Sequence, residues 1–292
     1  MAGLLQLLSS GLATGAIYAL AATGFTLLWQ ASATVNFAQG EFVMLPAFFV
    51  LASMQLLGLS FGWSIVVGVA LSIVVLGLLF KRLLVDPLSR YGFMPLVIAT
   101  IALGLFIKEA VKTSFSAEAL PFPALVPPIP VHMGDVTLSL QDISIFVFAV
   151  IAVAALQLFL TRTRTGRTMQ ATAQNRALAV ILGVPVSRMI LYTFLLNAAL
   201  VSLASILVSP IYLAKFSNGE SLGLIAFTAA IVGGFNQVRG AILGGFVVGI
   251  ADNLTAAYIS TEYRSALPLV LLIAIILFRP QGLLGRSEER TV

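Results

Sequence analysis

The chain has 292 residues, of which 60% are hydrophobic and only 9% are charged, with a formal net charge of +5. Soluble domains carry about 25% charged residues, so this composition excludes a soluble enzyme or binding module. The chain has no cysteine, which excludes disulfides and thiolate metal sites. We attribute the positive charge to membrane orientation, and not to nucleic-acid binding.

Apolar runs with few or no charges recur along the whole chain, and each approaches the ~20 residues that a helix needs to cross a bilayer. They predict an all-α polytopic membrane protein with about eight or nine transmembrane helices. The count stays open because several runs are shorter than a full crossing, so tilted, re-entrant or merged segments also fit. The first run follows no basic stretch, so we expect it to be a crossing and not a cleaved signal peptide. In chain order the candidate crossings are residues 4–28, 38–57, 61–80, 93–112, 143–160, 188–211, 222–236, 240–258 and 264–279.

The loops between these crossings differ in charge. Basic residues gather in 81–92, in 161–188 and in the tail, which carries Arg279, Arg286 and Arg290. Segment 108–142 instead balances two lysines against four acids and contains the rigid sequence PFPALVPPIP. The positive-inside rule places the three basic segments in the cytoplasm and the proline-rich loop outside. Nine crossings then put the N-terminus outside and the C-terminus in the cytoplasm.

Three short sequences occur twice, in the same order. FAQGEFVMLPAF (37–48) aligns with FSNGESLGLIAF (216–227), VVGVA with VVGIA, and MPLVIATIALGLFIK with LPLVLLIAIILFR. They predict two repeats, with halves of about 4–112 (segments 1–4) and 188–279 (segments 6–9), and with the fifth crossing as a spacer. Each segment of the second half comes five crossings after its equivalent in the first half. Because five is odd, the second repeat is inverted across the membrane. Inverted repeats are typical of transporters whose pathway lies between the repeats.

Glu41 is the only charged residue between Met1 and Phe80. One structural explanation of Glu41 is the helix dipole, which stabilises a glutamate in the first turn of a helix by about 0.3–1 kcal/mol. A second structural explanation is an ion pair with a basic loop or a contact with a partner subunit. An ionisable residue within a membrane segment is costly, however, and suggests a pathway. We expect Glu41 close to the cytoplasmic face, and we assign a translocation path or gate to the polar residues of the two aligned helix starts: Asn36, Gln39, Glu41, Asn218 and Glu220.

The longest basic stretch, TRTRTGRTMQATAQNRALAVILGVPVSR (161–188), turns helical in pattern from Arg167 onward, and Gly183 and Pro185 give a stop signal. This pattern predicts one short amphipathic helix in the cytoplasm. Such a helix lies on anionic headgroups or docks a soluble partner whose acids pair with its arginines. Its predicted apolar face comprises Met169, Ala173, Ala177, Val180 and Ile181.

This loop resembles the cytoplasmic loop of the permease subunits of bacterial ABC importers for branched-chain amino acids. GLATGAIYALAATGFTLLWQASATVNFAQGEFVML is similar to the N-terminal signature of that family, although Gln39 stands where the family has His or Gln. AAIVGGFNQVRGAILGGFVVGIADN and FRPQGLLG are similar to its glycine-rich and closing motifs. The resemblance covers nearly the whole chain.

The resemblance implies one transmembrane permease domain over 1–292, the shorter of two permease subunits, in the bacterial inner membrane. Its implied partners are a second permease, two cytoplasmic ATPases and a periplasmic binding protein. The chain itself is expected to bind no cofactor, because ATP is used by the ATPases and no Walker A pattern occurs here. Loop 161–188 is then the coupling element, and the residues implied are Gly166, Arg167, Ala173, Asn175, Arg176, Ala177 and Gly183.

Other functions are weighed against this one. No crossing pairs a nucleophile with a base, so we expect no enzyme, and the single histidine, His132, has no carboxylate cluster for a metal. The glycines of 233–245 lack the lysine of a phosphate loop and indicate close helix packing. The alternatives that remain are the same machinery for urea or short amides, an ion-coupled secondary transporter, and a passive channel or structural subunit.

Overall fold

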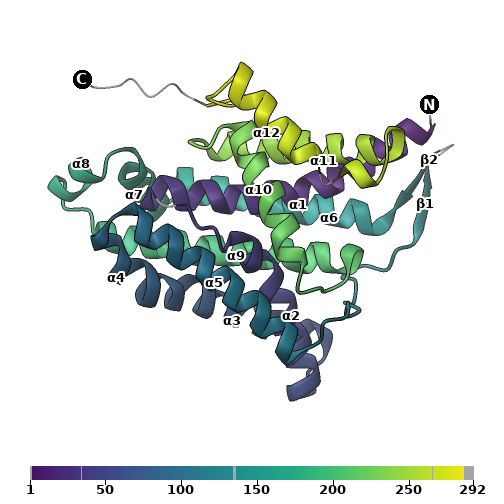
Figure 1. The fold of residues 1–292 in the computed structure, drawn as a ribbon, viewed down its shortest axis with the longest axis horizontal. Coiled ribbons are helices and arrows are strands. Elements are labelled where there is room, and N and C mark those ends of the chain that lie inside the picture. Colours follow the sequence, from purple (N-terminus) through teal and green to yellow (C-terminus); the bar gives the residue numbers. More distant parts are fainter. Residues whose placement is uncertain (1, 34, 134–135, 265, 286–292) are drawn as a thin grey trace.

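The computed structural model describes residues 2–33, 35–133, 136–264 and 266–285, and it shows a bundle of helices with one small hairpin (Figure 1). The tail residues Arg286 and Arg290 lie outside the described residues. The elements are α1 (Ala2–Ser32), α2 (Gln39–Leu57), α3 (Phe61–Ser72), α4 (Asp86–Leu88), α5 (Phe93–Ser114), β1 (Pro130–Met133), β2 (Val136–Ser139), α6 (Leu140–Arg162), α7 (Arg164–Gln174), α8 (Arg176–Ile181), α9 (Val186–Tyr212), α10 (Asn218–Gly233), α11 (Val238–Tyr258) and α12 (Leu267–Phe278).

Seven helical segments of the described residues are long and apolar enough to cross a bilayer. The protein is therefore an all-α polytopic membrane protein, as the composition predicts. The other two predicted crossings, 222–236 and 264–279, correspond to α10 and α12, which have 16 and 12 residues. Both are shorter than the ~20 residues of a full crossing.

The bundle has two distinct ends (Figure 1). We call the end that carries α7 and α8 the basic end, and the end that carries β1 and β2 the hairpin end. Helices α1, α6, α9 and α11 run between the two ends. The closing motif packs at the basic end, where the Leu283 and Leu284 amides donate to the last carbonyls of α10 at 2.8 and 2.9 Å.

Helix α1 is the centre of the bundle and packs against α6, α9, α10 and α11. Its closest neighbour is α11, because both helices present glycines at their contact. A Cβ on Gly249 would overlap the backbone of Gly15, and one on Gly245 would overlap Ala19. Small residues that let two backbones approach are the usual device of membrane helix pairs. The glycine-rich stretch thus serves close helix packing, as predicted.

The third crossing continues beyond its predicted end at residue 80. Two π-helical segments, Ile73–Leu79 and Lys81–Val85, extend α3 into α4, so the helical path reaches Tyr91. Lys81 is only 5% exposed, and its ammonium contacts Asp86 at 2.9 Å and the Ser187 hydroxyl at 3.3 Å. The prediction of a basic loop from residue 81 was wrong at this position, because these two partners let the helix bury the lysine.

The proline-rich segment at the hairpin end contains a short hairpin that the sequence does not predict. Strands β1 and β2 pair antiparallel. Further along, the backbones of Leu120 and Ala214 exchange two hydrogen bonds of 2.9 Å. This bridge joins the loop after α5 to the loop after α9.

Candidate functional site

Helices α2 and α10 begin at the same place in the bundle. A Cβ on Gly40 would overlap the carbonyl oxygen of Gly219 and crowd Gly223. The two aligned Gly-Glu pairs of the sequence therefore meet in space, at the N-terminal ends of their helices. Only glycines at these positions allow the two helix starts to touch.

This meeting point lies near the middle of the bundle. Gly104, near the middle of α5, lies against Ala38 and Glu41, and Gln39 pairs with Asn197, near the middle of α9. The expectation that Glu41 lies close to a membrane face was therefore wrong. Helix α1 extends to Ser32, yet Gln39, at the start of α2, lies beside Gly24, about two helical turns before the end of α1.

A cavity of about 390 Å³, which we call the charged pocket, opens beside the two helix starts. Its charged residues are Glu41, Lys108 and Glu220. The Lys108 ammonium contacts the Glu220 carboxylate at 2.5 Å. Glu41 is 6% exposed, and its Oε2 makes no hydrogen bond to any residue that the structure describes. The apolar walls are Phe25, Phe37, Ile101, Leu105, Leu224 and Phe227.

The pocket combines one buried carboxylate, one ammonium–carboxylate pair and an apolar lining. An ammonium group on a bound molecule is attracted to Glu41. A carboxylate on the same molecule can pair with Lys108 once that lysine leaves Glu220. An apolar side chain fits against the phenylalanine and leucine walls. The arrangement is suited to a zwitterion with an apolar side chain. The sequence prediction missed Lys108, although it lies one helical turn after Gly104 and so on the same face.

The remaining predicted path residues lie behind or beside the pocket. Gln39 is fully buried, and its side-chain amide exchanges hydrogen bonds of 2.7 and 3.2 Å with Asn197. The Asn36 carboxamide accepts from the Ala38 amide at 3.1 Å, and Asn218 donates to the Leu213 carbonyl at 2.7 Å. These contacts hold the starts of α2 and α10. Of the five predicted residues, Glu41 and Glu220 line the pocket.

The predicted coupling segment forms two helices, and not one. Asn175 adopts an extended conformation between α7 and α8, and its side chain accepts from the Leu178 amide at 3.0 Å. The predicted single apolar face is therefore divided, with Met169 buried on α7 while Val180 and Ile181 on α8 are exposed. Gly183, at φ +76°, ends the segment as predicted.

Contacts of the predicted coupling segment lead directly to the central helix. Arg176, at the start of α8, donates to the Ala31 carbonyl at the end of α1, at 2.5 Å. At the other end of α7, a Cβ on Gly166 would overlap the Phe159 carbonyl, so α6 and α7 make a tight corner. Arg167, Ala173 and Ala177 lie on the same two helices.

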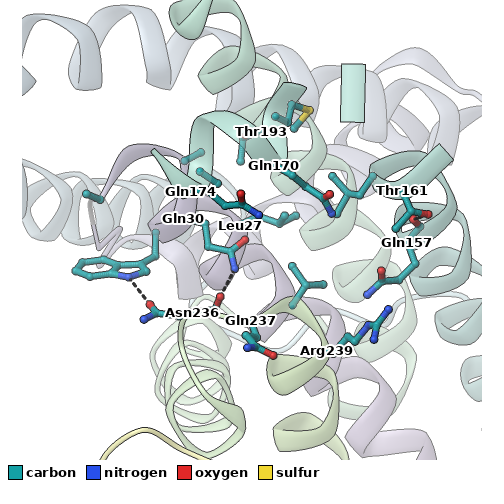
Figure 2. A pocket seen from close by; sticks show the side chains of 17 residues that line it. Leu27, Gln30, Gln157, Thr161, Gln170, Gln174, Thr193, Asn236, Gln237 and Arg239 are labelled. Atoms are coloured by element: carbon teal, nitrogen blue, oxygen red, sulfur yellow. Dashed lines mark hydrogen bonds between the residues drawn. The ribbon is translucent and has the colours of Figure 1, made fainter. Parts of the chain in front are cut away.

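A second cavity, of about 870 Å³, lies at the basic end between α1, α6, α7, α9 and the start of α11 (Figure 2). We call it the amide cavity, because six of its lining side chains are carboxamides: Gln30, Gln157, Gln170, Gln174, Asn236 and Gln237. The Trp29 indole donates to the Asn236 side chain at 3.1 Å, and the Gln30 side chain donates to the Asn236 backbone carbonyl at 2.5 Å. Figure 2 shows Gln30 beside Asn236. These bonds tie the end of α1 to the turn between α10 and α11.

A row of four aromatic rings connects the linings of the two cavities. Phe25 and Phe227, in the charged pocket, have ring centroids 5.7 Å apart, and Phe227 and Phe235 are 5.9 Å apart. Phe235 in turn packs edge-on against Trp29, in the amide cavity, at 5.3 Å. The row packs the end of α1 against α10 and the residues that follow α10, with tilted and edge-on ring pairs of the kind that aromatic side chains favour.

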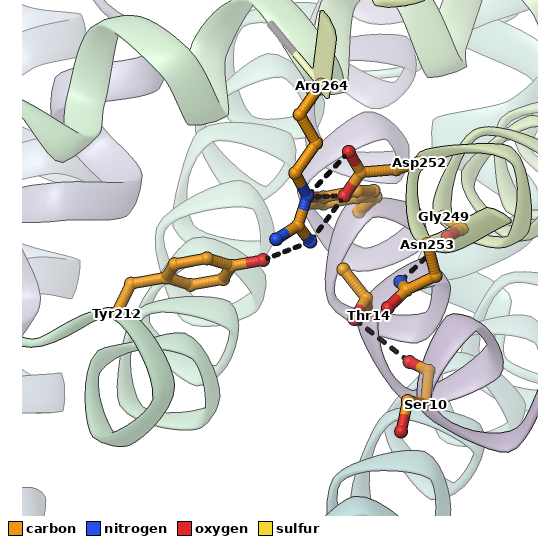
Figure 3. Close-up of polar contacts among 8 residues, drawn as sticks. Ser10, Thr14, Tyr212, Gly249, Asp252, Asn253 and Arg264 are labelled. Atoms are coloured by element: carbon orange, nitrogen blue, oxygen red, sulfur yellow. Dashed lines mark hydrogen bonds and ion pairs between the residues drawn. The ribbon is translucent and has the colours of Figure 1, made fainter. Parts of the chain in front are cut away.

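The hairpin end is held by a polar cluster (Figure 3). Arg264 donates to both oxygens of Asp252, at 2.9 and 2.8 Å, and to the Tyr212 hydroxyl at 3.0 Å. The Tyr18 hydroxyl donates to the same carboxylate at 3.2 Å. The hydrogen bond to Asp252 raises the pKa of Arg264 above its ordinary value, so the guanidinium stays charged. The cluster joins α1, α9 and α11.

Replacing Asp252 with alanine is expected to destabilise the protein by roughly 2–3 kcal/mol, because Arg264 and Tyr18 then lose their common buried partner. Glu109→Ala is the matched control. Its pair with Lys112 spans 3.5 Å and is largely exposed, so its loss costs at most about 1 kcal/mol. The thermal unfolding midpoint of the purified protein measures both effects. Equal shifts for the two variants would contradict the structural role of the Asp252 cluster.

Comparisons with known proteins match this chain over nearly its whole length. The family model described as branched-chain amino acid transport system / permease component matches residues 7–276. The high-affinity branched-chain amino acid transport system permease LivH of Escherichia coli K12 is 30% identical, over 99% of this chain and 97% of its own length. BraD of Pseudomonas aeruginosa, of the same description, is 33% identical over 99% and 98%.

More distant matches include a permease named for another solute. The fructose import permease FruG of Bifidobacterium longum is 28% identical over 84% of this chain and 70% of its own length. No solved structure matches the chain. The protein is thus a multi-pass membrane protein, and it belongs to the family of permease components of branched-chain amino acid transport systems.

Proposed function

We propose that the chain is a permease subunit of a bacterial ABC importer that moves branched-chain amino acids across the inner membrane. The observation that carries this proposal is the charged pocket, in which Glu41, Lys108 and Glu220 stand among apolar walls near the middle of the bundle. A leucine-like substrate has the matching groups: an ammonium, a carboxylate and a branched apolar side chain. Urea, short amides and sugars are uncharged, so they offer no partner for the charged side chains of this pocket.

The basic end then faces the cytoplasm, and so does the C-terminus. The proposed partners are a second permease subunit, two ATPases and a periplasmic binding protein. The exposed apolar side chains Val180, Ile181 and Leu182 on and after α8, together with the coupling residues, fit an ATPase cleft. The bridge between Leu120 and Ala214 joins the two loops, 113–141 and 212–221, on which the binding protein would dock.

The two halves of the permease domain are proposed to be inverted repeats, about 4–112 and 188–279. In support, equivalent helices pack against each other, α1 against α9 and α2 against α10. The starts of α2 and α10 also meet at Gly40 and Gly219 and then diverge (Figure 1). A twofold axis through this contact would exchange the halves and place the charged pocket beside the axis.

Transport then follows from contacts between the ATPase side and the pocket. Closure of the ATPases moves α7 and α8, and the bond from Arg176 to Ala31 passes that movement to the end of α1. Helix α1 carries Phe25 and Trp29, so its displacement separates the aromatic row and opens the charged pocket toward the basic end. No catalysis by this chain is required, because the ATPases hydrolyse the ATP.

Replacing Arg176 with glutamate is expected to uncouple ATP hydrolysis from uptake. The substitution removes the bond to Ala31 and places a negative charge at the C-terminal end of α1, which the helix dipole disfavours. We expect leucine uptake to fall roughly tenfold, equivalent to about 1.4 kcal/mol, with ATPase activity retained. The control is Arg164→Glu. Arg164 is an exposed arginine of the same segment, and it stands at the start of α7, where the helix dipole tolerates an acid. Normal transport by Arg176→Glu would exclude this coupling contact.

The proposed function is tested by uptake of labelled leucine into proteoliposomes that hold the complete transporter. Uptake should require ATP on the ATPase side and stop when ATP is withdrawn, even with an ion gradient kept. Uptake that persists on the gradient alone would favour an ion-coupled secondary transporter. Equilibration that needs neither ATP nor a gradient would indicate a channel.

A further inference from the structure

The amide cavity has a chemistry of its own, distinct from the charged pocket. None of the described residues that line it is acidic, and its single cation is Arg239. Six carboxamides surround it, and apolar contact is offered by Leu27, Leu160 and Met169. Figure 2 shows the side chains of Gln157, Gln170 and Arg239 arranged around the hollow.

This lining fits a small molecule that carries one carboxylate and one ammonium. Arg239 stands in the first turn of α11, so the guanidinium and the helix dipole both favour a carboxylate there. Across the hollow, the carboxamide oxygens of Gln157 and Gln170 can accept from an ammonium. A phosphate group is commonly bound by several cations, so the single arginine here disfavours it. A neutral solute does not require the charge of Arg239.

The cavity lies on the far side of the aromatic row from the charged pocket, so a molecule reaches it from the basic end. Its walls include Met169, Gln170, Ala173 and Gln174, all from α7. A ligand that touches both α7 and the start of α11 stabilises the conformation in which these two elements lie close together. In the proposed function, α7 must move in every transport cycle.

From this geometry we propose that the amide cavity binds the free zwitterionic amino acid on the cytoplasmic side and slows further transport. The inference rests on the proposed function, because it takes the accumulating product as the ligand. It adds an inhibitory site that is separate from the translocation path. Arg239 holds the carboxylate of the inhibitor, and Gln157 and Gln170 hold its ammonium.

The test uses proteoliposomes of the complete transporter with the ATPases facing outward, and with the binding protein and labelled leucine in the lumen. ATP and unlabelled leucine are added outside, and the initial rate of release is measured as external leucine rises. We expect the rate to fall at millimolar leucine. Inhibition is expressed relative to the uninhibited rate of each protein. On that scale, the leucine concentration for half inhibition should be roughly tenfold higher in Arg239→Gln than in the unaltered protein.

Arg188→Gln is the matched control, because it removes an exposed arginine of the same end that does not line the cavity, and its inhibition should equal that of the unaltered protein. Inorganic phosphate in place of leucine should leave the rate unchanged. Inhibition by phosphate alone would make the cavity an anion or headgroup site and overturn the inference. Equal inhibition of Arg239→Gln and the unaltered protein, or no inhibition, would also overturn it. Failure of release without external leucine would instead contradict the proposed function.

Discussion

Replacing Lys108 with methionine is expected to lower the rate of leucine uptake at least roughly tenfold. The substitution keeps the length and apolar stem of the side chain but removes the only cation among the described residues that line the charged pocket. Glu41 and Glu220 are then left as two carboxylates without a counter-charge, and the carboxylate of the substrate has no partner. Lys108→Arg, which keeps the charge, should retain most of the uptake.

Lys112→Met is the matched control for this result. Lys112 lies one helical turn further along α5, where its pair with Glu109 is largely exposed and lies outside the pocket. We expect its uptake to stay within about twofold of the unaltered protein, as for loss of an exposed ion pair. If Lys108→Met transports leucine as fast as Lys112→Met, the charged pocket does not bind the substrate as proposed.

Replacing Gly40 with leucine is expected to prevent stable folding. A Cβ at this position already overlaps the Gly219 carbonyl, so the larger side chain forces the starts of α2 and α10 apart. Overpacking of a well-packed contact costs about 1–3 kcal/mol, and here the obstruction is backbone, which cannot move out of the way as a side chain can. The yield of monodisperse protein on size-exclusion chromatography measures the effect.

Gly62→Leu provides the corresponding control. Gly62 lies in α3, and no atom from outside its own stretch of helix lies within 4 Å of the position that its Cβ would take. The same substitution should therefore leave the yield close to that of the unaltered protein. A folded, fully active Gly40→Leu variant would show that the two helix starts do not meet.

The sequence predicts most of the crossings well because long apolar runs leave little freedom in a membrane. The ranges 38–57 and 240–258 differ by at most two residues from α2 and α11. The aligned Gly-Glu pairs indicated that the two helix starts are related, and the structure places them in contact. That contact joins residues far apart in the chain, so only the comparison of the two halves could suggest it.

The role of Lys108 was not predictable in the same way. A lysine near the end of an apolar run is typical of a loop boundary, and its partner Glu220 lies 112 positions away. The depth of Glu41 was missed for a related reason, since it depends on where the chain turns back after Ser32. Asn175 fits a continuous helical pattern, yet its side chain bonds the Leu178 amide and divides the segment.

The central claim is that the substrate passes through the charged pocket, and the absence of native cysteine allows a direct test. Leu224→Cys places a single thiol in the pocket wall, and Thr261→Cys places one at the exposed hairpin end. In the complete transporter with ATP, leucine-loaded binding protein should slow thiol labelling at Leu224→Cys severalfold, compared with leucine-free binding protein, and leave labelling at Thr261→Cys unchanged. Labelling at Leu224→Cys that does not respond to leucine, under conditions in which the same variant transports it, would contradict this pathway.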